Sequence, residues 1–338
     1  KAIAKLSGNS LCIHTSGGSA GKMLEELVNK EGIESVVIPT QNWTRENFIA
    51  FENQTKAQYR FGFPGNELTE AEKETVIVSD EITMCHTGPS EMIAFLDDPK
   101  FVAFHPSPVP FDFDPLGEMT TFPTSDGKKA NGYLIKAKKP SNNWLFVYQE
   151  WWGLNDNIKA ESDKFYTDLG GNVNVIAIDM YDGKVTSNPQ EAGGFMRGTD
   201  EKRLEAIVLG ARDFAGKDAK IANVGWCFGG GWSLKSALLL GKQNVGSIIY
   251  YGMPVRDVEQ LKTLNSDVLG LFATEQYISE AVIKEFAANM ETAGKKLTYK
   301  IFPAVHGFSN PSNPKYDEAA SKEAYGMAIA YLREKFKV

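Results

Sequence analysis

The feature that most constrains this chain is a glycine-flanked cysteine between an apolar run and a helix-like run. Residues 225–230 read Gly-Trp-Cys-Phe-Gly-Gly, the apolar stretch 221–224 precedes them, and a helix-like stretch follows at 232–240. Glycines two positions before and after Cys227 let a strand and a helix approach closely at a sharp turn. The helix N-terminus that this cysteine faces favours thiolate over thiol. The pattern predicts a nucleophile elbow, and the alternative is a buried structural cysteine in a glycine-rich turn.

A cysteine nucleophile needs a base, and only one of the four histidines follows the elbow in sequence. That residue is His306, at the end of a strand-like run. In α/β-hydrolases the chain order is nucleophile, acid, histidine, so a strand-end carboxylate is expected between positions 227 and 306. Glu275 follows the apolar run 268–273 and is the candidate that orients His306. Its alternative interpretation is an ordinary solvated surface charge.

Four further motifs lie in order around the elbow. They are residues 149–155 (Gln-Glu-Trp-Trp-Gly-Leu-Asn), 179–181 (Asp-Met-Tyr), 250–252 (Tyr-Tyr-Gly) and 305–308 (Val-His-Gly-Phe). With the elbow, they give the chain from about residue 80 to 338 a resemblance to the dienelactone hydrolase family of α/β-hydrolases. The resemblance implies hydrolysis of small carboxylic esters or lactones through an acyl-thioester, with no cofactor and no metal.

The resemblance also implies roles for individual residues. Cys227 would be the nucleophile, His306 the general base, and Glu150 an extra carboxylate beside the thiol that keeps the resting cysteine protonated. The backbone N–H groups of Trp151 and Phe228 would form the oxyanion hole. An exposed strand-end carboxylate is the alternative interpretation of Glu150. The possible substrate pocket comprises Trp152, Tyr181, Tyr251 and Phe308.

Two departures from the family pattern bear on the acid and on the substrate. The family acid is normally Asp three residues before a β-branched residue, and Glu275 stands three residues before Ile278. Gln276 can instead be aligned with the acid, which would leave the triad without one. The arginines that grip a substrate carboxylate are replaced by Asn310 and by the arginine-free stretch 188–194. A more apolar ester is therefore expected as substrate rather than a dienelactone carboxylate.

The first quarter of the chain matches no part of a hydrolase. Residues 16–32 predict a loop, a helix and a glycine stop, and two strands of period two follow. With these motifs, residues 1–75 resemble an internal piece of a ribokinase-like 6-phosphofructokinase, which implies a sugar-phosphate contact for Arg45 and Arg60. Solvated strand charges are the alternative for both arginines. The family's Gly-Ala-Gly-Asp segment is absent from the sequence, so kinase activity is not expected.

These patterns divide the chain into three parts. Residues 1–75 are an incomplete α+β segment, accessory and derived from a gene fusion, residues 76–117 are an irregular connection, and residues 118–338 are the α/β-hydrolase domain. In the last part a hairpin signal at 125–127 is followed by alternating strand and helix patterns. The alternation predicts an α/β-hydrolase fold with a mostly parallel sheet and helices on both faces. The alternative function is a sugar-phosphate or protein binding module with a vestigial hydrolase site.

Charge and cysteine content narrow the possible partners. A net charge of −7 without a basic block argues against nucleic acid and anionic membranes, and the sequence lacks the long apolar run of a membrane span. The three cysteines lack metal-ligand spacing, and Cys85, His86 and His105 are interpreted as structural or loop residues. A catalytic thiol favours a location in the reducing cytoplasm. The alternative is a periplasmic or secreted form whose leader has been removed. No feature of the sequence indicates an oligomeric state.

Overall fold

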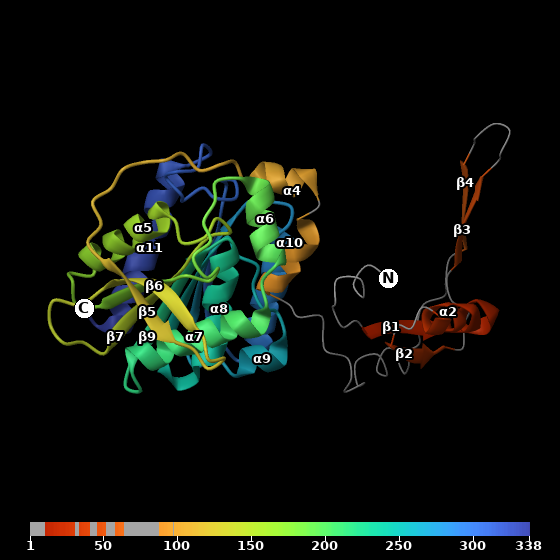
Figure 1. Cartoon of the computed structure of the whole chain (residues 1–338), viewed down its shortest axis with the longest axis horizontal. Coiled ribbons are helices and arrows are strands. Elements are labelled where there is room, and N and C mark those ends of the chain that lie inside the picture. The colour runs from red at the N-terminus through yellow and green to blue at the C-terminus, as the bar shows by residue number, and fades with distance from the viewer. Residues whose placement is uncertain (1–10, 31–33, 41–45, 52–57, 64–87, 97) are drawn as a thin grey trace. The chain divides into compact units, whose positions relative to one another are not determined.

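Two units make up the chain, Lys1–Cys85 and His86–Val338. The computed structural model describes residues 11–30, 34–40, 46–51, 58–63, 88–96 and 98–338. Figure 1 colours these residues along the chain from red to blue.

The first unit holds a βαβ arrangement and a hairpin. Strands β1 (Leu11–Ser16) and β2 (Glu34–Pro39) pair in parallel, with helix α2 (Gly18–Lys30) between them in the chain. Strands β3 (Glu46–Phe51) and β4 (Gln58–Phe63) pair antiparallel. The predicted helix and two strands are thus present, although the helix begins within the expected loop. Outside the described residues lie Gly32, Arg45, Cys85, His86 and the side chain of Arg60.

An eight-stranded sheet is the frame of the second unit (Figure 1). Only the pairs β5–β6 and β6–β8 are antiparallel, and all other neighbours are parallel. Strands β5 and β6 form the predicted hairpin. In spatial order the strands are β12 (Leu297–Phe302), β11 (Val268–Ala273), β10 (Asn244–Tyr250), β9 (Lys220–Trp226), β7 (Asn143–Tyr148), β8 (Asn174–Ile178), β6 (Lys129–Ile135) and β5 (Glu118–Pro123).

Helices cover both faces of this sheet (Figure 1). On one face α5 (Asp156–Asp168) and α11 (Glu318–Phe336) are joined by a hydrogen bond of 2.7 Å from the Tyr325 hydroxyl to Asp168. On the other face α7 (Glu201–Ala215) packs against α8 (Phe228–Leu240). The remaining helical segments are η1 (Pro89–Phe95), α4 (Pro99–Phe104), α6 (Pro189–Arg197), η2 (Gly241–Gln243), α9 (Val258–Lys262) and α10 (Glu280–Thr292).

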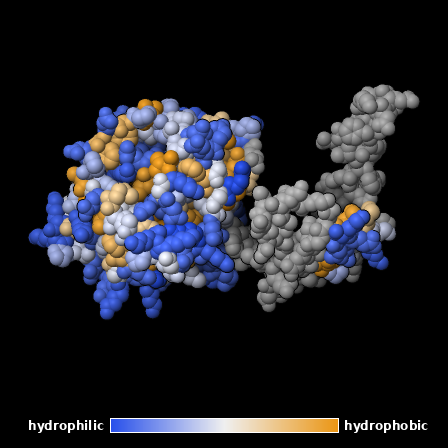
Figure 2. Space-filling view, in the orientation of Figure 1, coloured by the Kyte–Doolittle hydropathy of each residue, from blue (hydrophilic) through white to orange (hydrophobic). Residues whose placement is uncertain are grey.

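The core lies between the sheet and its two helix layers. Strands β8 and β11 are buried at every position, as expected for parallel strands covered on both faces. The face of the molecule in Figure 2 is mostly hydrophilic, with apolar residues in scattered patches. The structure therefore confirms the predicted α/β-hydrolase fold. Among the described residues, no helix combines the length and apolar character needed to cross a membrane.

The described part of the expected connection, residues 88–96 and 98–117, contains two short helices. The sequence predicts a helix-like run ending at Leu96, where η1 lies, whereas α4 was not expected. Met92 and Phe101 in these helices are each 1% exposed, so both helices are anchored in the hydrolase core. Because α4 is only six residues long and prolines lie around it, its sequence favours a loop interpretation.

Candidate active site

Cys227 lies at the turn from β9 into α8. Its backbone has φ 54° and ψ −119°, and a positive φ at a non-glycine residue is a strained conformation. A Cβ atom on Gly225 would lie 2.1 Å from the carbonyl oxygen of Gly229, and one on Gly229 would lie 2.3 Å from that of Gln149. Strand and helix can therefore meet this closely only with glycine at both positions. The geometry is that of the predicted elbow.

Two loops at the ends of β11 and β12 bring a carboxylate and an imidazole together. Thr274, directly after β11, holds the loops in place through its N–H to the carbonyl of Ala304 (2.9 Å) and its hydroxyl to that of Phe302 (2.8 Å). The next residue, Glu275, places Oε1 2.7 Å from Nδ1 of His306, and both side chains are 2% exposed. Because a carboxylate only accepts, Nδ1 carries a hydrogen.

The other ring nitrogen of His306, Nε2, is buried and has no hydrogen-bond partner among the described residues. Burial by itself lowers the pKa of His306, but the Glu275 carboxylate and the Cys227 thiolate outweigh it and raise that pKa well above its usual value. The carboxylate of Glu275 therefore stabilises the protonated imidazole of His306. Gln276, which the alternative alignment placed at the acid position, is exposed.

Glu150 lies just after β7, and its carboxylate is held by two polar side chains. Asn310 Nδ2 donates to Oε2 at 2.5 Å, and the Tyr251 hydroxyl donates to Oε1 at 3.5 Å. Burial raises the pKa of Glu150 to about 7, against the opposing effects of the His306 charge and of these hydrogen bonds. Asn310, which stands where the family has a substrate-gripping arginine, thus contacts a carboxylate of the protein itself.

Replacing Glu150 by glutamine is expected to stabilise the fold at pH 8 and to have a much smaller effect at pH 5. The folded-state pKa of about 7 exceeds the usual 4.5, so the folded protein holds the extra proton and loses stability as pH rises through this window. The gap of about 2.5 units corresponds to roughly 2–4 kcal/mol at pH 8. Urea unfolding at both pH values measures the difference, with the exposed Glu259→Gln as the control. A pH-independent difference would contradict the buried-charge explanation.

Trp151 and Phe228 are the predicted oxyanion-hole donors. Trp151 lies in the loop after β7, and Phe228 directly follows Cys227 at the elbow. Phe228 is the first residue of α8, where backbone N–H groups have no partner within the helix. Trp151 follows Glu150, and its side chain is 1% exposed. The preceding Gln149 accepts a hydrogen bond from the N–H of Met180 at 3.2 Å, which ties the loop after β7 to the loop after β8.

The four predicted pocket residues are buried, and Tyr251 and Tyr181 border the reactive groups. The Tyr251 ring lies 4.9 Å from that of His306. The Tyr181 hydroxyl is buried without a hydrogen-bond partner among the described residues, and burial followed by the charge of the nearby thiolate raises its pKa well above the usual value. Trp152 and Phe308 pack against neighbouring aromatic rings instead.

The structure adds His105, which the sequence interpretation left in a loop. His105 caps α4, is 5% exposed, and places Nε2 3.6 Å from Sγ of Cys227. Its ring centroid lies 4.6 Å from that of His306 and 4.3 Å from that of Trp151. Nδ1 lies 2.8 Å from the carbonyl oxygen of Phe101, so Nδ1 donates and Nε2 turns its lone pair to the thiol. Burial, and then the charge of His306, lower the pKa of His105 well below its usual value.

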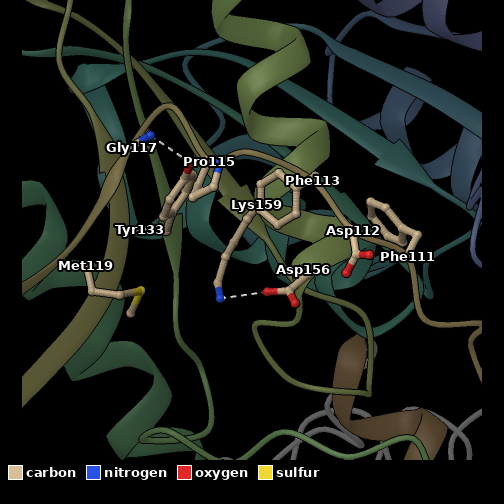
Figure 3. Close-up of a pocket in the computed structure, with 9 residues that line it drawn as sticks. All are labelled: Phe111, Asp112, Phe113, Pro115, Gly117, Met119, Tyr133, Asp156 and Lys159. Carbon is tan, nitrogen blue, oxygen red and sulfur yellow. Dashed lines mark hydrogen bonds and ion pairs between the residues drawn. The ribbon is translucent and has the colours of Figure 1, made fainter.

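A cavity of about 340 Å³ lies apart from this cluster (Figure 3). Lys159 reaches Asp156 at 2.9 Å, and the Tyr133 hydroxyl accepts from the N–H of Gly117 at 2.7 Å, so these polar groups are already paired. No residue of the cysteine–histidine cluster lines the cavity. Its lining residues are Phe111, Asp112, Phe113, Pro115, Gly117, Met119, Tyr133, Asp156 and Lys159.

The sequence model of the dienelactone hydrolase family matches residues 130–336, which include Cys227, Glu275 and His306. The chain belongs to the dienelactone hydrolase family. It is therefore a carboxylic ester hydrolase by class, and the resemblance predicted from the separated motifs is confirmed.

Individual relatives agree with this assignment. A protein of Saccharolobus solfataricus, named provisionally as a carboxymethylenebutenolidase, is 28% identical over 258 residues, covering 64% of this chain and 98% of that protein. A crystal structure from Klebsiella pneumoniae, described provisionally as a dienelactone hydrolase, superposes with a TM-score of 0.57 at 17% identity, covering 66% of this chain and 100% of the other. At that identity the superposition supports the fold alone.

A second resemblance involves a much shorter stretch. The ATP-dependent 6-phosphofructokinase isozyme 2 of Mycobacterium tuberculosis is 44% identical over 69 residues, which cover 20% of this chain and 20% of the kinase. The predicted likeness to a kinase fragment is thereby confirmed. Because only a fifth of the kinase is matched, its activity does not transfer to this chain.

Proposed function

We propose that this dienelactone hydrolase-family protein cleaves small neutral carboxylic esters or lactones through a triad of Cys227, His306 and Glu275. The observation that carries the proposal is the meeting of a positive-φ elbow cysteine with a histidine whose Nδ1 lies 2.7 Å from a buried carboxylate. An activated thiol, a base and an orienting carboxylate are the groups that nucleophilic acyl transfer requires.

In the acylation half-reaction, the Cys227 sulfur adds to the carbonyl carbon of the ester. The carbonyl π electrons move to oxygen, and the N–H groups of Trp151 and Phe228 stabilise the resulting charge. When the tetrahedral intermediate collapses, the bond from carbon to the alcohol oxygen breaks, and the Nε2 proton of His306 passes to that oxygen. The products are the free alcohol and an acyl-thioester on Cys227.

In the deacylation half-reaction, neutral His306 takes a proton from a water molecule as the water oxygen adds to the thioester carbonyl. The carbon–sulfur bond then breaks, and the carboxylic acid leaves with the thiolate–imidazolium pair restored. Glu275 accepts the Nδ1 hydrogen throughout, which fixes the tautomer and stabilises the imidazolium. Glu150, with a pKa of about 7, is the carboxyl group that would exchange a proton with the resting site near neutral pH.

A neutral substrate is favoured because Asn310, at the position of the family's substrate-gripping arginine, donates to the protein's own Glu150 carboxylate. Aromatic rings line the surroundings of the thiol. An apolar acyl group therefore suits the site better than a second carboxylate.

A panel of p-nitrophenyl esters of graded acyl length, a neutral lactone and a dienelactone carboxylate tests the proposal. We expect kcat/KM to be highest for short or medium neutral acyl groups and about 10–100-fold lower for the dienelactone carboxylate, because charge-assisted hydrogen bonds to it are missing. Intact-mass spectrometry of acid-quenched reactions should show the acyl adduct on the Cys227 peptide. A preference for the dienelactone would contradict the neutral-substrate proposal, and no turnover of any ester would contradict the function.

The alternative of a binding module with a vestigial hydrolase site is not favoured. The family match spans the elbow, acid and histidine, whereas the kinase likeness covers a fifth of the chain.

A further inference from the structure

Three side chains that can bind a soft metal converge at the elbow. One ligand atom of each of His105, Cys227 and His306 lies within 4.8 Å of the other two, and all three residues are buried. His105 comes from the short helix α4, and the other two come from the ends of β9 and β12. Ester hydrolysis as proposed above uses one histidine, so the second histidine needs a separate explanation.

Both imidazoles are held in the orientation that metal-binding histidines adopt. Nδ1 of His105 donates to the carbonyl of Phe101 at 2.8 Å, and Nδ1 of His306 donates to Glu275 at 2.7 Å. A backbone carbonyl or a carboxylate at the far nitrogen fixes the tautomer and raises the basicity of the ligating nitrogen. In both rings Nε2 is therefore the nitrogen that faces the thiol: that of His105 carries a lone pair, and that of His306 offers one once its proton leaves. Nε2 of His306 is buried without a hydrogen-bond partner among the described residues.

The distance between the thiol of Cys227 and Nε2 of His105 matches tetrahedral zinc. Zinc binds thiolate at about 2.3 Å and imidazole at about 2.0–2.1 Å, which puts sulfur and nitrogen about 3.6 Å apart at a tetrahedral angle. The observed distance from Sγ of Cys227 to Nε2 of His105 is 3.6 Å. Two histidines and one cysteine leave a fourth position for water, and thiolate with imidazole selects zinc and related soft ions over magnesium or calcium.

We propose that His105, Cys227 and His306 form a site for Zn²⁺ or a similar soft divalent ion, and that the bound ion blocks the nucleophile. The metal ion comes from solution and replaces the Nε2 proton of His306 in the thiolate–imidazolium pair, so one proton is released and no electron is transferred. A thiolate lone pair in the metal–sulfur bond cannot attack a carbonyl. The block depends on the proposed catalytic role of Cys227, whereas metal binding itself does not.

Cobalt titration of the full-length, reduced, metal-free protein tests binding without any assay of activity. Co²⁺ at the site is expected to give a thiolate-to-cobalt charge-transfer band in the near ultraviolet and the intense visible bands of tetrahedral coordination. Zn²⁺ should displace Co²⁺ and abolish both signals. A spectrum of octahedral Co²⁺ without charge transfer would overturn the proposal.

Variants assign the ligands. Cys227→Ala is expected to lose the charge-transfer band, and His105→Gln is expected to weaken Zn²⁺ binding by more than about 100-fold, since loss of a mere supporting contact already costs 10–100-fold. The double variant Cys12→Ser/Cys85→Ser is the matched control and should keep the wild-type spectrum. An unchanged Zn²⁺ affinity in His105→Gln, or loss of the band in the double variant, would contradict the assignment.

Zinc K-edge X-ray absorption identifies the zinc ligands in the wild-type protein itself, so its result does not depend on whether the variants fold. We expect one sulfur at about 2.3 Å and imidazole nitrogens at about 2.0–2.1 Å. A shell with no sulfur, or with several, would exclude the site. If esters are turned over, Zn²⁺ should inhibit with a concentration dependence that follows binding, and a chelator should reverse it. Binding without inhibition would count against the role of Cys227 and not against the metal site.

Discussion

Cys227→Ala is expected to lower kcat for p-nitrophenyl esters by at least about 10⁴-fold, since loss of the nucleophile removes the covalent pathway and leaves only the oxyanion hole and binding. Cys227 is 3% exposed at the strained turn into α8, where its sulfur lies beside His105 and the charge-coupled His306. Among the described residues, no other nucleophilic side chain lies at the turn from β9 into α8. Turnover should be measured under saturating substrate.

Matched variants separate loss of the nucleophile from loss of the fold. Cys227→Ser keeps an attacking oxygen at the apex and should retain more activity than the alanine variant. Cys12→Ser and Cys85→Ser should behave as wild type, because both cysteines lie in the other unit. Thermal unfolding checks that the Cys227 variants fold. Wild-type turnover in a folded Cys227→Ala protein would refute the thiol mechanism.

Glu275→Gln is expected to lower kcat by about 10²–10⁴-fold, by analogy with loss of the orienting carboxylate in other triads. Glutamine fills the same volume but carries no charge, so it neither enforces the Nδ1–H tautomer of His306 nor stabilises the imidazolium. The present contact is 2.7 Å between two side chains that are each 2% exposed. Gln276→Ala changes the exposed neighbour and should leave kcat unchanged.

The pH profile distinguishes orientation of the base from a merely structural role of Glu275. The Glu275 carboxylate contributes to the raised pKa of His306, so its removal should lower that pKa. The alkaline limb of kcat/KM, which reports loss of the His306 proton that the leaving alcohol takes up in acylation, should accordingly move to lower pH in Glu275→Gln. Glu275→Asp, which keeps the charge, should keep the wild-type limb. A reduced rate with an unmoved alkaline limb would show that Glu275 acts on stability alone.

Much of the hydrolase was readable from local sequence. The glycines around Cys227 predicted the elbow because only glycine lets β9 and α8 meet: a Cβ on Gly225 would lie 2.1 Å from the carbonyl oxygen of Gly229. Chain order selected His306 and Glu275, and the alternating patterns predicted the mostly parallel sheet. These features depend on neighbours in the chain or on a fixed order along it.

The second histidine could not be found in this way. Phe101 and His105 are four residues apart at the end of a six-residue helix, so a shared helix face was the only signal. The proline-rich sequence after His105 favoured a loop over that helix interpretation. Nothing in the chain order indicates that a segment more than a hundred positions before the elbow places its imidazole on the thiol. Likewise, the pairing of Asn310 with Glu150 joins loops 160 positions apart.

The sequence by itself determined the fold, the elbow and the family, because strand, turn and helix preferences act over a few residues and the order of motifs along the chain is specific to the family. Only the tertiary structure decided what surrounds the thiol. In the structure Glu275, and not the exposed Gln276, contacts His306. Asn310 and Tyr251 bind the carboxylate of Glu150. His105, which the sequence placed in a loop, contacts the sulfur of Cys227. Those contacts arise where strand ends and a covering helix meet, and their energies depend on burial and distance that no local pattern encodes.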